Sequence, residues 1–167
     1  MKPDNSSEAF LDTTFILPFF QININVEAFT LNKFKEFLTK LPQVHLSELS
    51  IFEAKAKLQR LSRKNTNYLQ ALKAFGTNLV TLREDEKFVF HPYTAQDDEN
   101  FNIIYSKNLG LDSFDIIIIA QALNTGILIT EDKEILSARE QTTFKKDPTL
   151  GKIKIKRWKE VNYHPTR

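Results

Sequence analysis

Short apolar runs alternate with amphipathic stretches along this 167-residue chain, as is typical of strands that alternate with helices. Strands joined by helices pair in parallel through right-handed crossovers, so the sequence predicts one α/β domain built on a mainly parallel sheet. We expect five strands, at AFLD (9–12), VHL (44–46), KFVFH (87–91), ILIT (127–130) and GKIKIKRW (151–158).

The segments between these strands have helical signals. Phe34, Phe37, Leu38 and Leu41 recur at the spacing of one helix face. Ser50 and Glu53 match a capping box, which would start a helix that runs to about residue 64. Further helices are expected over 13–20 with a bend or end near Pro18, over 68–75 with Gly76 just after the last turn, over about 95–107, from Asp112 or Ser113 to Gly126, and over 131–140. All four glycines would then fall at element ends.

Composition and chain ends limit the class of protein. We expect one domain over 9–160, a flexible amino terminus over 1–8 and a tail over 161–167. The absence of cysteine excludes disulfides, thiolate zinc sites and cysteine nucleophiles. The amino terminus does not resemble a signal peptide, and the longest apolar runs are far shorter than the ~20 residues of a membrane span. We therefore expect a soluble, cytoplasmic protein.

Four carboxylates occupy positions where an α/β sheet would bring them together. Asp12 ends the first strand and Asp132 follows the fourth, while Glu53 and Asp115 are expected in the first turns of helices. The carboxyl ends of parallel strands and the amino ends of the following helices share one edge of the sheet, where ligands bind. Two like charges ~4 Å apart repel by ~4 kcal/mol at an effective dielectric of about 20, so such a cluster must bind a cation or retain protons.

Each acid also has an ordinary structural explanation. Glu53 could be only the capping partner of Ser50, and Asp115 could serve only the helix end that begins near Asp112. Asp12 could cap a helix, and Asp132 could be an acid in a loop. The four explanations would have to hold together, so the set favours a divalent-metal site, with Asp112 and Glu134 as weaker candidate ligands.

The segments around these acids resemble, in order, the four motifs of the PIN-domain ribonucleases: LDTTFIL, SELSIFEAKAKL, LDSFDIIIIAQAL and ILITEDKEIL, together spanning about 9–140. The resemblance implies a parallel sheet of strand order 3-2-1-4-5. It also implies that Asp12, Glu53, Asp115 and Asp132 bind Mg²⁺ or Mn²⁺ and carry out RNA hydrolysis. Thr130 would orient the Asp132 carboxylate, and we assign similar supporting roles to Thr13, Asp112 and Glu134. Many members are VapC-type toxins of toxin–antitoxin pairs, and TTFILPFF resembles archaeal members.

Charge along the chain is uneven although the net charge is only +2. Residues 54–83 hold seven bases and no acid, residues 84–140 hold twelve acids and four bases, and residues 141–167 hold eight bases and two acids. Either basic block could position an RNA backbone, through Lys55, Lys57 and Arg60 or through Lys154 and Lys156. The alternative is that these side chains only solvate the surface.

Other enzyme classes lack their motifs. The first strand is followed by Asp-Thr-Thr, whereas an aspartyl-phosphate phosphatase would have Asp-x-Asp, and there is no glycine-rich phosphate loop. No zinc-site spacing connects His45, His91 and His164, and His45 is expected to pack in the core. Trp158 could stack a base, but it more commonly would close a sheet edge. The remaining alternative is a catalytically weak or inactive PIN-like module that binds RNA or a protein.

Fourteen phenylalanines suggest an interface. The segment FILPFF (15–20) and the helix around Phe34 and Phe37 provide more aromatic surface than a small domain needs, so we expect a homodimer. The alternative is that these rings fill the core of one subunit. The PIN-domain resemblance also implies pairing and, in VapC-type members, an antitoxin whose tail reaches the acidic crevice, where an arginine would meet the carboxylates.

Overall fold

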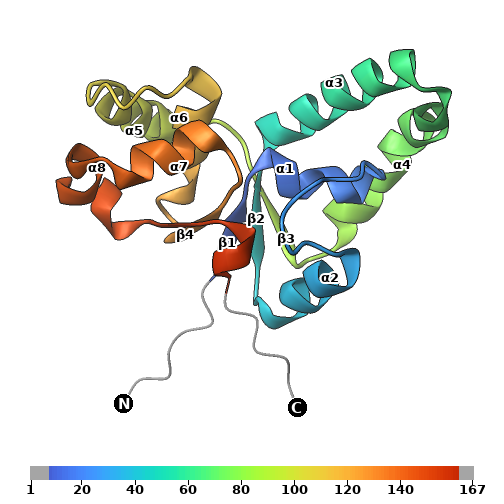
Figure 1. The fold of residues 1–167 in the computed structure, drawn as a ribbon, viewed down its shortest axis with the longest axis horizontal. Helices are drawn as coiled ribbons and strands as arrows, with labels where there is room; N and C mark the ends of the chain where they lie inside the picture. Colours follow the sequence, from blue (N-terminus) through green and yellow to red (C-terminus); the bar gives the residue numbers. More distant parts are fainter. Residues whose placement is uncertain (1–7, 162–167) are drawn as a thin grey trace.

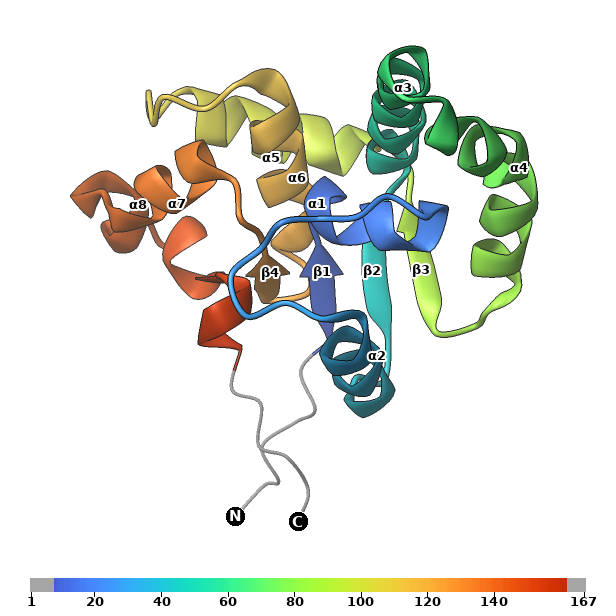
Figure 2. The same ribbon diagram turned by 45° about the vertical axis from the view of Figure 1, so that its right-hand side comes forward.

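The computed structural model of the protein, described here for residues 8–161, is built on one five-stranded parallel sheet. The strand order is β3-β2-β1-β4-β5, which confirms the predicted fold class and order. Figure 2 shows β1 at the centre of the sheet, between β4 and β2. The strands are short: β1 Ala9–Leu11, β2 Val44–Ser47, β3 Phe88–His91, β4 Ile127–Ile129 and β5 Lys154–Lys156.

Helices cover both faces of the sheet (Figure 1). One core lies beneath α1 (Thr13–Ile16), η1 (Leu17–Phe20), α2 (Leu31–Lys40), α3 (Glu48–Lys64), η2 (Thr66–Tyr68) and α4 (Leu69–Glu84). The other lies beneath α5 (Ala95–Tyr105), α6 (Ser113–Ala122), α7 (Lys133–Glu140), α8 (Thr142–Lys146) and η3 (Leu150–Lys152). The last element is η4 (Trp158–Glu160), whose tryptophan packs in the first core.

Successive strand residues alternate between the two cores. Leu11 and Leu46 pack in the first core, while Phe10 and Leu128 pack in the second. Strands buried on both faces have continuous apolar sequences, which is why the strands were recognisable from short apolar runs. None of the helices in residues 8–161 is both long and apolar enough to cross a membrane.

The phenylalanines predicted to form an exposed surface lie instead inside the first core. Trp158 is 6% exposed, and the rings of Phe15, Phe34 and Phe37 have centroids 5.9, 5.8 and 5.5 Å from its own. Phe20 stacks on Phe75 of α4 with the ring centroids 4.1 Å apart. The alternative that these rings fill the core is therefore correct, and the exposed-aromatic argument for a dimer is wrong. Trp158 closes the core and is not available to stack a base.

Two predicted helix boundaries are also wrong. Helix α3 begins at Glu48, and the side chain of Ser47 caps it by accepting a hydrogen bond from the Leu49 amide at 3.2 Å. Ser50 and Glu53 therefore lie inside the helix and form no capping box. Helix α4 continues through Gly76 to Glu84, so this glycine does not end an element.

Packing explains why α4 continues. Phe75 and Leu82 are buried in the first core, and Leu79 packs against it. These apolar residues lie on either side of Gly76 at helical spacing, and their burial outweighs the ~1 kcal/mol that glycine costs inside a helix. The predicted fifth strand is also shorter than expected, because Leu150–Lys152 form a 3-10 turn before it.

Candidate acidic metal site

Asp12 lies at the end of β1, deep in the site and only 8% exposed. It caps α1: one carboxylate oxygen, Oδ1, accepts a hydrogen bond from the Thr13 amide at 2.6 Å. The other, Oδ2, accepts a hydrogen bond from the Thr130 hydroxyl, also at 2.6 Å. Both oxygens are thus held in place by neighbouring groups, which fixes the direction in which Asp12 presents its charge.

Asp132 occupies the equivalent position after β4. It caps α7 through Oδ1, which accepts hydrogen bonds from the Glu134 amide at 2.8 Å and the Ile135 amide at 3.0 Å. Its own amide donates to the Thr130 hydroxyl at 2.9 Å. Thr130 therefore orients the carboxylate of Asp12 and the backbone of Asp132. The predicted contact between Thr130 and the Asp132 carboxylate is absent from the described residues.

Glu53 reaches the site from the second turn of α3, and not from the first turn as predicted. The Thr13 hydroxyl donates a hydrogen bond to Glu53 Oε2, and it lies 2.8 Å from the hydroxyl oxygen of the buried Ser50. Thr13 thus connects the start of α1 to α3 and positions Glu53. Ser50, which the sequence suggested as a helix cap, instead lies beside this contact.

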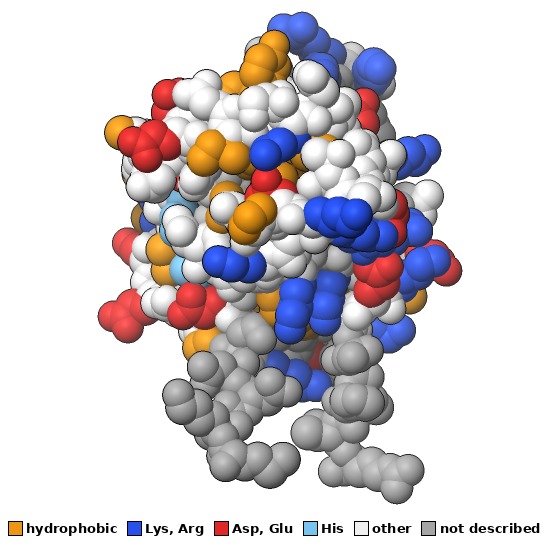
Figure 3. Space-filling view, turned by 90° about the vertical axis from the view of Figure 1, so that its left-hand side faces the viewer, with side chains coloured by type: hydrophobic (Ala, Val, Ile, Leu, Met, Phe, Trp, Pro, Cys, Tyr) orange, Lys and Arg blue, Asp and Glu red, His pale blue; other side chains and the backbone are white. Residues whose placement is uncertain are grey.

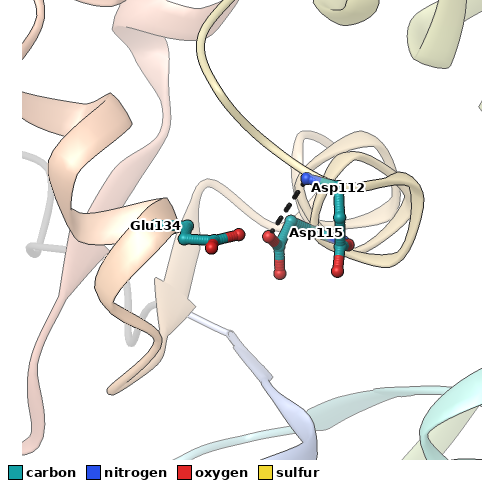
Figure 4. A group of neighbouring side chains, drawn as sticks. All are labelled: Asp112, Asp115 and Glu134. Atoms are coloured by element: carbon teal, nitrogen blue, oxygen red, sulfur yellow. Dashed lines mark hydrogen bonds between the residues drawn. The ribbon is translucent and has the colours of Figure 1, made fainter.

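Asp115 belongs to the first turn of α6, where it forms a capping box with Asp112. The Asp115 amide donates to Asp112 Oδ1 at 2.9 Å. Glu134 extends from α7 toward this pair (Figure 4). In residues 8–161, these three acids are the one set whose potential ligand atoms all lie within 4.8 Å of one another. Asp112 and Glu134, which we ranked below the four main acids, are therefore spaced closely enough to share an ion with Asp115.

Electrostatic coupling joins these acids into one site. The pKa of Asp12 is raised to about 6, mainly by burial and to a smaller extent by the Asp132 and Glu53 carboxylates. Burial also raises the pKa of Asp115 to about 7, with additional contributions from Asp132 and Asp112. The charge of Asp132 contributes at both acids, although Asp12, Glu53 and Asp132 do not belong to the set of carboxylates that lie within 4.8 Å of one another. The resulting site lies at the carboxyl edge of the sheet, between α3 on one side and α6 and α7 on the other (Figure 1).

The capping roles of these acids are real, but they leave the repulsion unresolved. Asp12, Asp112 and Asp132 each cap a helix. Amide hydrogen bonds alone would lower a carboxyl pKa, whereas the pKa values of Asp12 and Asp115 are raised. A divalent cation would relieve this repulsion. The donors are all carboxylate oxygens, which suit Mg²⁺ or Mn²⁺.

The basic residues proposed for RNA binding lie in different places. Lys55 extends toward α4, where its ammonium is 4.7 Å from the centre of the Phe75 ring. Lys57 and Arg60 are exposed on α3. Lys156 is the last residue of β5 and lies level with Ile129, and its carbonyl accepts a hydrogen bond from the Thr130 amide at 3.0 Å, so its backbone lies at the same edge of the sheet as the acids. Lys154 is the first residue of β5 and lies level with Ile127.

Comparison with known proteins agrees with this geometry. The chain has 16% sequence identity to the protein in the crystal structure of PAE2754 from Pyrobaculum aerophilum, with a TM-score of 0.54 over 83% of each chain, which shows a shared fold. No curated protein sequence matches the chain. The sequence profile of the PIN domain matches residues 9–140, a range that contains Asp12, Glu53, Asp115 and Asp132. The chain therefore belongs to the PIN-domain family, a family of metal-dependent nucleases.

Proposed function

We propose that this protein is a divalent-metal-dependent endoribonuclease that acts in the cytoplasm. Asp12, Glu53, Asp115 and Asp132 would hold Mg²⁺ or Mn²⁺, with Asp112 and Glu134 completing the acidic site. The observation that carries the proposal is the set of Asp112, Asp115 and Glu134, whose potential ligand atoms lie within 4.8 Å of one another at the sheet edge where Asp12 is buried after β1. A site built only to cap helices would have no need to gather these acids at one edge.

When bound, the cation would supply positive charge to the scissile phosphate and make a coordinated water more acidic. The protein's own part is to fix its carboxylates in advance. Thr130 and the Thr13 amide hold Asp12, and the Thr13 hydroxyl holds Glu53. The amino ends of α6 and α7 carry Asp115 and Asp132 and favour their negative charge. This prior positioning lowers the cost of gathering ligands around an ion.

The test is Asp12→Asn. The amide keeps the shape of the carboxylate, and its oxygen can accept from the Thr13 amide while its NH₂ group donates to the Thr130 hydroxyl. We expect a folded protein that has lost cleavage of single-stranded RNA by at least about a hundredfold, because one charged ligand is gone. Wild-type cleavage should require added Mg²⁺ or Mn²⁺ and stop with EDTA.

Thermal unfolding provides the control for this assay. Mn²⁺ should raise the melting temperature of the wild-type protein, by mass-action stabilisation of the folded state, and should raise that of Asp12→Asn much less. Undiminished, EDTA-sensitive cleavage by a purified and folded Asp12→Asn protein would refute the assignment. Metal binding without any cleavage would favour the alternative, a catalytically inactive RNA-binding or protein-binding module.

The resemblance to VapC-type members suggests a regulatory partner, and we propose that the chain is the toxin of such a pair. An antitoxin tail would insert an arginine among the carboxylates of Asp12, Asp115 and Asp132, where it would compete with the cation. A candidate partner encoded beside this gene should weaken Mn²⁺ binding when added to the protein. Independent binding of partner and Mn²⁺ would show that the partner does not occupy the acidic site.

A further inference from the structure

We infer that one flank of α3 is a binding track for the sugar-phosphate backbone of a single RNA strand that leads away from the acidic site. The inference rests on the proposed nuclease function, because the track would be the path by which the RNA substrate reaches Glu53. Helix α3 begins beside the carboxyl ends of β1 and β2 and runs away from the sheet (Figure 1). A strand that follows this helix would therefore have one end at the acids.

The spacing of the bases along α3 defines the track. Lys57, Arg60 and Lys64 follow Glu53 at i+4, i+7 and i+11, the spacing that places residues on one flank of a helix. At 1.5 Å per residue, the row from Glu53 to Lys64 extends roughly 16 Å. Residues 54–83 contain no acid, so the row is not interrupted by an opposite charge on its own helix. The track therefore begins at a site carboxylate and continues as positive charge alone.

These three bases are exposed and have no structural use within residues 8–161. No hydrogen bond or ion pair to Lys57, Arg60 or Lys64 is formed in that range. Two other bases of the same helix pair are engaged: Arg83 of α4 binds Glu48, and Lys55 lies over Phe75. Arg63 of α3 is exposed like the three bases of the row, but it lies on a different flank of the helix. The negative end of the helix dipole would account for Lys64, which lies in the last turn, but not for Lys57 or Arg60 in the middle.

The second basic block is less suited to this role. Lys154 lies level with Ile127 toward the opposite edge of the sheet from the acids, and only Lys156, level with Ile129, lies at the carboxyl edge, so this block offers no row of bases that leads away from the site. The face that carries α8 also mixes positive and negative side chains (Figure 3). There Lys145 pairs with Glu140, Lys107 with Asp147 and Arg139 with Glu160. A strand on that face would meet acids as well as bases.

Phe52 indicates that the bound strand is single. It directly precedes Glu53 and is 71% exposed, more than any other large apolar side chain in residues 8–161. Its side chain lies roughly 100° around α3 from Glu53, at the margin of the row and nearest to Arg60. An exposed ring at the margin of a line of bases resembles the stacking platforms that hold single strands, on which any unpaired base can lie. The bases of a duplex are stacked on one another and leave no face for Phe52. The track therefore favours single-stranded RNA over duplex RNA.

The test measures RNA binding and keeps cleavage out of the measurement. Binding of an unstructured oligouridylate is measured in EDTA with the full-length Asp12→Asn protein over a range of salt concentrations. Adding Lys57→Gln, Arg60→Gln and Lys64→Gln should flatten the slope of log affinity against log salt by about 2, since each lost contact to a single strand removes about 0.7. At about 0.1 M salt, this corresponds to about a hundredfold weaker binding.

A matched variant controls for total charge. Lys146→Gln, Lys152→Gln and Lys154→Gln remove the same number of charges from exposed positions at the other end of the molecule. Added to the Asp12→Asn protein, these substitutions should leave its salt slope nearly unchanged. Equal losses in the two triple variants would overturn the track, because the effect would then come from net charge. An unchanged slope in the α3 variant would also overturn it, even if the wild-type protein proves to be a nuclease.

Phe52→Ala separates stacking from charge. We expect it to weaken oligouridylate binding roughly tenfold at every salt concentration, with an unchanged salt slope, and to affect duplex RNA little. Unchanged RNA affinity, or an equal loss for duplex and single strand, would exclude the stacking role. If the wild-type protein binds RNA through α3 but cuts nothing, the nuclease proposal fails and the track remains.

Discussion

The hydroxyl of Thr130 serves two acids at once. It donates to the Asp12 carboxylate and accepts from the Asp132 amide, so one buried side chain joins the ends of β1 and β4. Thr13 has the corresponding role between α1 and α3, where it holds Glu53. Contacts of this kind fix the acids before any ion arrives. They also explain why a site with raised pKa values can persist in a folded protein.

The raised pKa values predict how metal-free stability depends on pH. Folded Asp12 and Asp115 hold their protons up to about pH 6 and 7, whereas in the unfolded chain both should titrate near pH 3.9. At these two positions the folded state therefore binds more protons in between, so their contribution to the free energy of unfolding should fall as pH rises from about 4 to about 7. Urea unfolding in EDTA across this range measures the effect.

Two comparisons make the result specific to the site. Saturating Mn²⁺ at pH 7 should restore stability, since the ion replaces the lost protons as the source of positive charge. The Asp12→Asn protein should lose the part of the pH dependence that belongs to Asp12. An identical pH dependence of metal-free stability in the wild-type and Asp12→Asn proteins would contradict the raised pKa of Asp12.

Helices and strands of this protein differ in how strongly the local sequence determines where each one ends. Helix α4 passes through Gly76 because the apolar residues on both sides of it pack on the core. At Gly126 the local signal is stronger: its φ of +77° lies in the left-handed region, which disfavours any residue with a Cβ. One glycine is therefore tolerated in a helix, and the other is required for the turn into β4.

This difference predicts opposite effects of the same substitution. Gly76→Ala should stabilise the protein by about 0.5–1 kcal/mol, because a Cβ there meets no atom within 4 Å and alanine is the better helix former. Gly126→Ala should destabilise it by about 1 kcal/mol or more, because the left-handed conformation is strained for alanine. Urea midpoints of the two variants against wild type give the answer. Destabilisation by Gly76→Ala would mean that α4 breaks at that residue.

At the scale of the whole molecule, α3 stands opposite α6 and α7 across the carboxyl edge of the sheet (Figure 1). The acids come from α3, from the amino ends of α6 and α7 and from the residue that follows β1. The first core beneath α3 is rich in aromatic rings, and the second is mainly aliphatic. The aromatic residues that suggested an interface are needed in the first core. The expected homodimer therefore rests on the family resemblance alone.

We still expect a homodimer. Because the aromatic residues are buried within one subunit, a substitution among them should change stability without changing the oligomeric state. Light scattering at micromolar concentration should give twice the chain mass of 19.4 kDa. Phe34→Leu should lower the free energy of unfolding by about 1 kcal/mol, because Phe34 packs against Phe15 and Trp158, yet should leave the mass unchanged. A monomer mass for the wild-type protein would refute the dimer. Dissociation of the dimer by Phe34→Leu would show that Phe34 contributes to the subunit interface.

The sequence by itself determined the strand order, through its resemblance to a family, and the identity of the acids at strand and helix ends. Both kinds of information can be read from the sequence: the motifs occur in a fixed order, and a short apolar run followed by an aspartate indicates the end of a strand without reference to distant residues. Asp12, Asp115 and Asp132 could be assigned in this way, as could the capping partnership of Asp112 with Asp115.

Only the tertiary structure decided which groups meet across elements. Thr130 turned out to hold Asp12, 118 positions away, and Thr13 to hold Glu53 from another helix. Tertiary packing also buries the phenylalanines of the first core and allows α4 to continue through Gly76. Lys55 contacts Phe75 of α4 and does not share the flank of α3 that carries Lys57 and Arg60. The physical reason is that burial and side-chain contact depend on the packing of distant segments, which outweighs local preferences of about 1 kcal/mol per residue.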